Sequence, residues 1–140
     1  PRGGTRIIGL PLLLLAGVGA ILVGAFPENV NPTVHDLASL LVFAPGGLAF
    51  LVLAVGMAPD TSWGGGRAYS ALLGAVTLVA LAYYVPTQGP NTTWDPGLIE
   101  RLIVAPILVW GLGAAVHLAR LRTWPRLAPG VPTERRTDSR

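Results

Sequence analysis

Four long apolar stretches set the limits on how this chain can fold. A hydrocarbon core about 30 Å thick is crossed by a helix of ~20 apolar residues. The stretches that reach or approach this length cover about residues 7–26, 37–57, 69–85 and 98–118. Their apolar residues run on without the period-two alternation of a barrel strand, which favours helices. Because backbone groups in lipid must be paired within their own segment, we expect an all-α bundle of four transmembrane helices.

The composition agrees with a membrane protein and excludes several kinds of site. Only 12% of the 140 residues are charged, against about 25% in soluble domains. The chain has no cysteine, which excludes disulfides, thiolate metal sites and thioether-linked haem. All ten basic residues are arginine, so a Schiff-base lysine and a P-loop are also excluded. His35 and His117 are expected at opposite ends of the bundle and cannot ligate one haem, so we expect no cofactor.

The arginines predict how the chain is oriented. With four spans, one side of the membrane receives Arg2, Arg6, Arg67, Arg120, Arg122 and Arg126. The positive-inside rule makes that side cytoplasmic. We therefore expect a multi-pass protein of the cell membrane with both termini in the cytoplasm. Although the pI is about 10.2, arginines gathered at span ends indicate membrane orientation rather than a nucleic-acid partner.

Residues outside the spans complete the expected organisation. Residues 1–119 form the transmembrane domain, and the proline-containing, charged residues 120–140 predict a flexible cytoplasmic tail. Trp63, Trp94 and Trp124 stand at span boundaries, where amphipathic rings anchor at headgroup level. Asn91 begins an Asn-Thr-Thr sequon on the outer side. Small residues recur at four-residue spacing, the pattern of closely packed membrane helices, at Ala16, Ala20 and Gly24 and at Gly111, Ala115 and Ala119.

The outer side carries an unusual group of ionisable residues. The first loop and the start of the fourth span supply Glu28, His35, Asp36, Glu100 and Arg101. An unpaired guanidinium near the membrane edge is unfavourable. We therefore expect Arg101 to pair with Glu28 or Glu100, and His35 to pair with Asp36.

The helix ends beside this group also follow from the sequence. Pro27 is expected to end the first helix, because proline cannot continue it. Thr33 is well placed to cap the second helix, with His35 and Asp36 in its first turn. An aspartate there would complement the positive end of the helix dipole. These positions would bring the ionisable residues to one end of the bundle.

Two motifs resemble those of a known family. The stretch "GAFPENVNPTVHDL" has a G-x-F-P-E…H pattern at Gly24, Phe26, Pro27, Glu28 and His35. The stretch "GLIERLIVAPILVW" has an E-R-x-x-x-x-P-x-x-x-W pattern at Glu100, Arg101, Pro106 and Trp110. In this order the motifs resemble the domain-of-unknown-function 998 (DUF998) family of prokaryotic integral membrane proteins. The resemblance implies a membrane-embedded helical fold but no reaction. Family members usually have about six spans, so the resemblance implies either a short member or the C-terminal four spans.

Three classes of function remain open. The first is a non-enzymatic membrane protein, an accessory or small subunit whose partners are the lipid bilayer and other membrane subunits or its own copies. In this case the polar group orders helix ends, and no residue is catalytic. The second is a metal-dependent enzyme with His35, Glu28 and Asp36 as candidate ligands. The third is a transporter or lipid-handling protein that uses Glu28, Glu100 or Arg101.

Overall fold

A computed structural model describes residues 3–57, 63–87 and 96–123. This part of the chain is all-helical and contains no strand. Its four α-helices are α1 (Gly3–Ala25), α2 (Pro32–Gly56), α3 (Gly66–Thr87) and α4 (Pro96–Thr123). Each helix is long and apolar enough to cross a membrane, over Gly4–Ala25, Pro32–Gly56, Gly66–Pro86 and Leu98–Leu121. The expected all-α fold with four membrane-spanning helices is confirmed.

The ends of the helices differ from the expected ones. The helix α4 continues to Thr123, so the first residues of the predicted tail are helical. The rest of that tail, and the predictions for Asn91, Trp94 and Trp124, fall outside the described residues.

The start of α2 corrects the predicted cap. Asn31 is the N-cap, and its side-chain oxygen accepts a hydrogen bond from the Val34 N–H at 3.1 Å. Pro32 follows at the first helical position, where its fixed φ suits the helix and its missing N–H would have no partner anyway. Thr33 is therefore inside the helix, and the prediction that it caps α2 was wrong. For the same reason Asp36 is not in the first turn.

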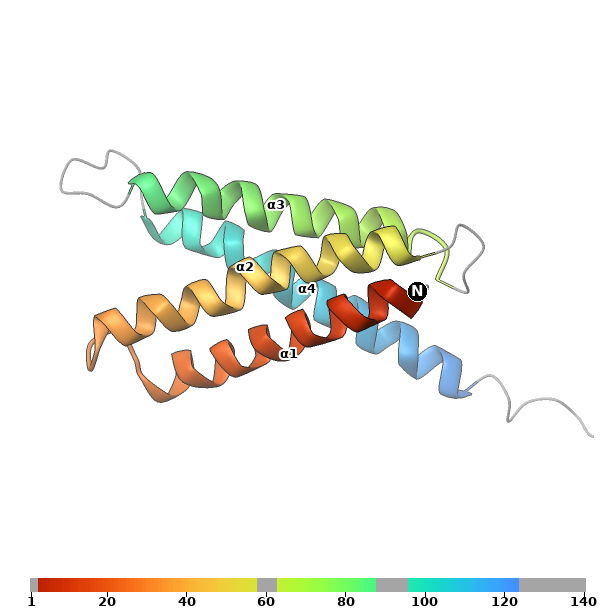
Figure 1. Cartoon of the computed structure of the whole chain (residues 1–140), viewed down its shortest axis with the longest axis horizontal. Coiled ribbons are helices and arrows are strands. Elements are labelled where there is room, and N and C mark those ends of the chain that lie inside the picture. Colours follow the sequence, from red (N-terminus) through yellow and green to blue (C-terminus); the bar gives the residue numbers. More distant parts are fainter. Residues whose placement is uncertain (1–2, 58–62, 88–95, 124–140) are drawn as a thin grey trace, which may run out of the picture.

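The helices form an open row rather than a closed bundle. In chain order, α1 packs on α2, α2 on α3 and α3 on α4, while α4 crosses behind α2 and contacts it much less (Figure 1). Among the described helices, the backbone of α1 comes close only to α2. Both α1 and α4 reach α2 at Gly46, in the middle of that helix. A Cβ added there would lie 3.6 Å from both Ala16 of α1 and Ile107 of α4. The two outer helices α1 and α4 are thus not packed along each other.

Glycines allow the first three helices to approach backbone to backbone. A Cβ added at Gly19 would lie 2.8 Å from the Val42 nitrogen and 2.9 Å from the Ala38 carbonyl oxygen of α2. On the other side of α2, a Cβ added at Gly74 would lie 2.8 Å from the Gly47 carbonyl oxygen. Lipid tails are as apolar as leucine, so membrane helices associate largely through such close packing. These glycines therefore fix the spacing of α1, α2 and α3.

The packed face of α1 is not the predicted one. Gly9, Ala16 and Gly19 are buried against α2, whereas Ala20 and Gly24 are exposed. Residues four apart advance 400° around a helix and drift off one face, while alternating steps of three and four stay on it. The predicted ridge in α4, Gly111, Ala115 and Ala119, is likewise exposed. The four-residue spacing identified small residues but not the face that packs within this chain.

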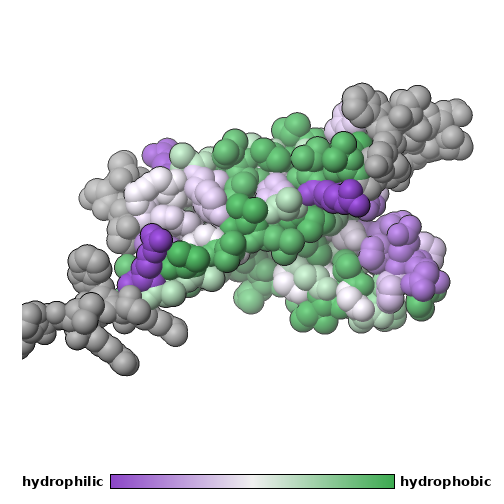
Figure 2. Space-filling model, turned by 180° about the vertical axis from the view of Figure 1, so that it is seen from behind, coloured by the Kyte–Doolittle hydropathy of each residue, from purple (hydrophilic) through white to green (hydrophobic). Residues whose placement is uncertain are grey.

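The surface divides into an apolar band and two polar ends. Figure 2 shows hydrophobic residues around the middle of the molecule and hydrophilic residues gathered towards both ends. We call one end the arginine end, because it carries Arg6, Arg67 and Arg120. We call the other the acidic end, because it carries Glu28, Asp36 and Glu100. This distribution is that of a multi-pass membrane protein.

The close approach at Gly19 can be tested with alanine. We expect Gly19→Ala to lower the free energy of unfolding by about 1–3 kcal/mol, because the new methyl group would meet the α2 backbone. Gly17→Ala is the matched control, since a Cβ there meets nothing within 4 Å. The control should be neutral or gain up to about 1 kcal/mol from helix propensity. Thermal unfolding in detergent measures both, and equal stability of the two variants would contradict this packing.

Candidate functional site

The turn between α1 and α2 builds one side of the acidic end. The Pro27 carbonyl accepts hydrogen bonds from the N–H groups of Val30 and Asn31, at 2.9 Å and 3.1 Å. The His35 side chain reaches back across this turn and donates from Nδ1 to the Phe26 carbonyl, 3.1 Å away. That carbonyl lies just beyond the end of α1, where the helix offers it no donor. Two residues of the first motif, Phe26 and His35, thus meet in space, and His35 bonds to the main chain rather than to Asp36.

A tyrosine, not an arginine, is the partner of Glu100. The Tyr84 hydroxyl, near the end of α3, donates to Glu100 Oε1 near the start of α4 at 2.6 Å. The carboxylates of Glu28 and Asp36 lie within electrostatic range of the same hydroxyl. The structure therefore places Tyr84 and Glu100 in direct contact at the end that also carries Glu28 and Asp36. Sequence reasoning missed this residue, although the Tyr83-Tyr84 pair at the end of an apolar stretch was a usable signal.

A small core supports this hydrogen bond. Next to this hydrogen bond, Leu81 of α3 packs with Ile99 and Ile103 of α4. Ile103 is fully buried, and Phe43 of α2 packs against the same cluster. The faces of α3 and α4 that meet in this core also bring Tyr84 and Glu100 together. The position of the polar pair is therefore set by apolar packing.

Arg101 is exposed and forms no ion pair with a carboxylate of the described residues. Consecutive residues of a helix point about 100° apart. Since Glu100 faces Tyr84 of α3, its neighbour Arg101 projects in a different direction around α4. The expected pairing of Arg101 with Glu28 or Glu100 is thus not formed within the described part of the chain. In that part, no three His, Asp or Glu side chains gather closely enough to hold a metal ion.

The second motif positions α4 against its neighbours. Pro106 is buried, and the Trp110 ring stacks on Phe50 of α2 with centroids 4.6 Å apart and planes 18° apart. The Trp110 indole N–H donates to the hydroxyl of Ser70 in α3 at 2.9 Å. Ser70 is fully buried, so this bond satisfies both polar groups away from water. Trp110 therefore joins α2, α3 and α4 in one contact.

From Trp110 the aromatic contacts continue to the arginine end. The Trp63 ring lies 6.5 Å from Trp110 and 5.8 Å from Tyr69, tilted against both. On its other side it stacks on the His117 imidazole of α4, with centroids 4.9 Å apart and planes 12° apart. Trp63 lies just before α3, at a span boundary as expected. Its ring also packs against the Trp110 and His117 rings of α4. His117 was not expected to be part of an aromatic cluster.

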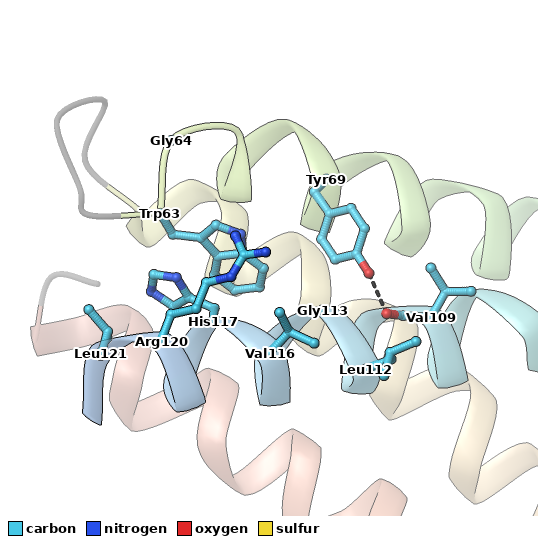
Figure 3. A pocket seen from close by; sticks show the side chains of 10 residues that line it. All are labelled: Trp63, Gly64, Tyr69, Val109, Leu112, Gly113, Val116, His117, Arg120 and Leu121. Carbon is cyan, nitrogen blue, oxygen red and sulfur yellow. Dashed lines mark hydrogen bonds between the residues drawn. The ribbon is translucent and has the colours of Figure 1, made fainter. Parts of the chain in front are cut away.

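A cavity of about 590 Å³ opens beside these rings (Figure 3). The Tyr69 hydroxyl donates to the Val109 carbonyl of α4 across it. A Cβ at Gly113 would lie 2.6 Å from that hydroxyl, so a larger residue there would require the tyrosine ring to shift. The remaining lining residues are Trp63, Gly64, Leu112, Val116, His117, Arg120 and Leu121. This cavity was not predicted, because its walls come from residues far apart in the sequence.

Together, the four apolar helices, the polar ends and the paired motifs define a multi-pass helical membrane protein. The family of proteins of unknown function DUF998 matches residues 1–117. The chain belongs to this family, as the two motifs indicated. No curated protein and no solved structure matches it.

The pairing of Glu100 can be tested by double-mutant cycles. We expect Tyr84→Phe and Glu100→Ala to be coupled by about 0.5–1.5 kcal/mol in unfolding free energy, because either change removes the same hydrogen bond. The control cycle combines Glu100→Ala with Arg101→Ala and should show coupling near zero. Thermal unfolding in one detergent provides all the values. Strong coupling in the control cycle, with none in the tyrosine cycle, would restore the arginine pairing.

Proposed function

We propose that this chain is a non-enzymatic accessory or small subunit that joins other membrane helices, foreign or its own copies. The observation that carries the proposal is the outward face of α4. Only 11% of the apolar stretch of α4 is buried, against 39% for α2. This exposed surface includes the small-residue ridge Gly111, Ala115 and Ala119.

Lipid can cover an exposed apolar face, so exposure alone is not the argument. A ridge of small residues lets a second helix approach closely, as Gly19 and Gly74 do inside this chain. A Cβ at Gly111 meets nothing within 4 Å, so at this position the ridge is not packed against another described helix. A partner helix seated there would also close the open row on its α4 side. In this proposal the polar contacts of the acidic end order the helix ends and carry no chemistry.

The same proposal includes an orientation. We infer that the arginine end faces the cytoplasm, which the positive-inside rule supports. The acidic end then faces outward, together with the turn between α1 and α2.

Cysteine labelling tests the orientation, because the chain has no cysteine of its own. We expect Asn29→Cys, in the exposed turn of the acidic end, to react with an impermeant maleimide in intact cells. Gly65→Cys, exposed before α3, should react only after the membrane is opened. The opposite pattern would reverse the orientation, and labelling of both sites in intact cells would contradict the four-span topology.

The association through α4 can be tested with a bulky substitution. We expect Ala115→Trp to reduce the amount of partner or second copy that co-purifies from native membranes in mild detergent, with little change in thermal stability. Val79→Trp is the control, because Val79 is 70% exposed on α3, away from the ridge. Light scattering and cross-linking measure the assembly. A wild-type protein that is a stable monomer with nothing attached would refute the proposal.

A further inference from the structure

The cavity at the arginine end has a polar mouth and an apolar floor. We propose that it binds one anionic phospholipid, with the lipid phosphate at Arg120 and an acyl chain along α4. This goes beyond the proposed function, since it assigns a lipid site at the opposite polar end from the ordered acidic group.

The charge at this end suits a phosphate. Arg120 lines the cavity, and Figure 3 shows its side chain extending from α4 toward Trp63. Arg6 and Arg67 lie at the same end, whereas the described carboxylates lie at the acidic end. A guanidinium has five N–H donors and binds phosphate in a bidentate way. Arg120 can therefore bind a phosphate with some of these donors and keep its contact to the protein with the others.

The apolar wall suits an acyl chain rather than a water-soluble ligand. Val109, Leu112 and Val116 line the cavity and are 46%, 67% and 43% exposed. From Val109 to Arg120, α4 rises about 16 Å, which is close to half of a hydrocarbon core of about 30 Å. The cavity thus follows the depth of one leaflet, from the headgroup level inward. A small soluble phosphate compound would contact only its mouth.

The aromatic contacts keep this space open. The Trp63–His117 stack closes one side, and the bond from Tyr69 to the Val109 carbonyl holds α3 and α4 at a fixed distance. Gly113 leaves the floor free of a side chain between them. Amphipathic rings of this kind favour the membrane interface. The volume of about 590 Å³ falls within the range of ligand sites, about 300–1,000 Å³.

The charge requirement is tested with lipid binding to the purified full chain. We expect native mass spectrometry to show retention of added dioleoylphosphatidylglycerol over dioleoylphosphatidylcholine, and the former to raise Tm. Arg120→Gln should weaken this binding about tenfold or more, the loss expected for one charged hydrogen-bonding group. Arg67→Gln is the matched control, since Arg67 is exposed at the same end but does not line the cavity. Equal binding of the two lipids, or equal losses in the two variants, would overturn the proposal.

The acyl-chain wall is tested separately. Val116→Trp should fill the cavity and reduce phosphatidylglycerol retention while keeping Arg120, whereas Leu108→Trp, on an exposed part of α4 outside the cavity, should not. Inorganic phosphate and glycerol 3-phosphate serve as the soluble arms, and neither should raise Tm at concentrations where the lipid does. If a soluble phosphate stabilises the protein as well as the lipid, or Val116→Trp leaves lipid retention unchanged, the lipid assignment is wrong.

Discussion

Direct contact between helix backbones is the constraint on which the rest of the structure depends. In a bilayer, apolar side chains gain little by leaving lipid for another helix, so association needs close packing and satisfied polar groups. Gly19 supplies this between α1 and α2, and the Gly47–Gly74 contact supplies it between α2 and α3. Because α2 has such a contact on both sides, it is the central helix of the row. The other helices take their positions from it.

The fourth helix is held by different means. Its contacts with α3 combine an apolar core at Ile103 with hydrogen bonds from Tyr84 and Tyr69, one towards each end. Trp110 adds a third, buried hydrogen bond to Ser70 and a stacked ring on α2. Away from water such bonds are valuable chiefly because an unpaired group would be costly. The crossing of α4 is thus fixed by side chains, and it leaves the face with Gly111 and Ala115 exposed.

The two polar ends differ in kind because of this packing. At the acidic end the helices are joined by satisfied contacts, His35 to the Phe26 carbonyl and Tyr84 to Glu100, so the polar groups close the structure. At the arginine end the rings of Trp63 and Tyr69 hold α3 and α4 apart around a cavity. The acidic end, which carries the site residues predicted from the sequence, therefore has its helix ends joined by hydrogen bonds. The arginine end, whose charges predict only an orientation, contains the cavity proposed to bind lipid.

The sequence by itself determined the all-helical membrane fold, the number of spans, the family and the two polar ends, because these follow from apolar length, charge position and short motifs. It also placed His35 and Glu100 at the same end. Only the tertiary structure decided their partners. Which neighbour Glu100 meets depends on the rotation of α4, which is set by the burial of Ile103 and the stacking of Trp110 on Phe50. The cavity likewise depends on the distance between α3 and α4, which no local pattern encodes. Spacing along one helix gives the residues that share a face, but the partner of that face is chosen by packing between helices.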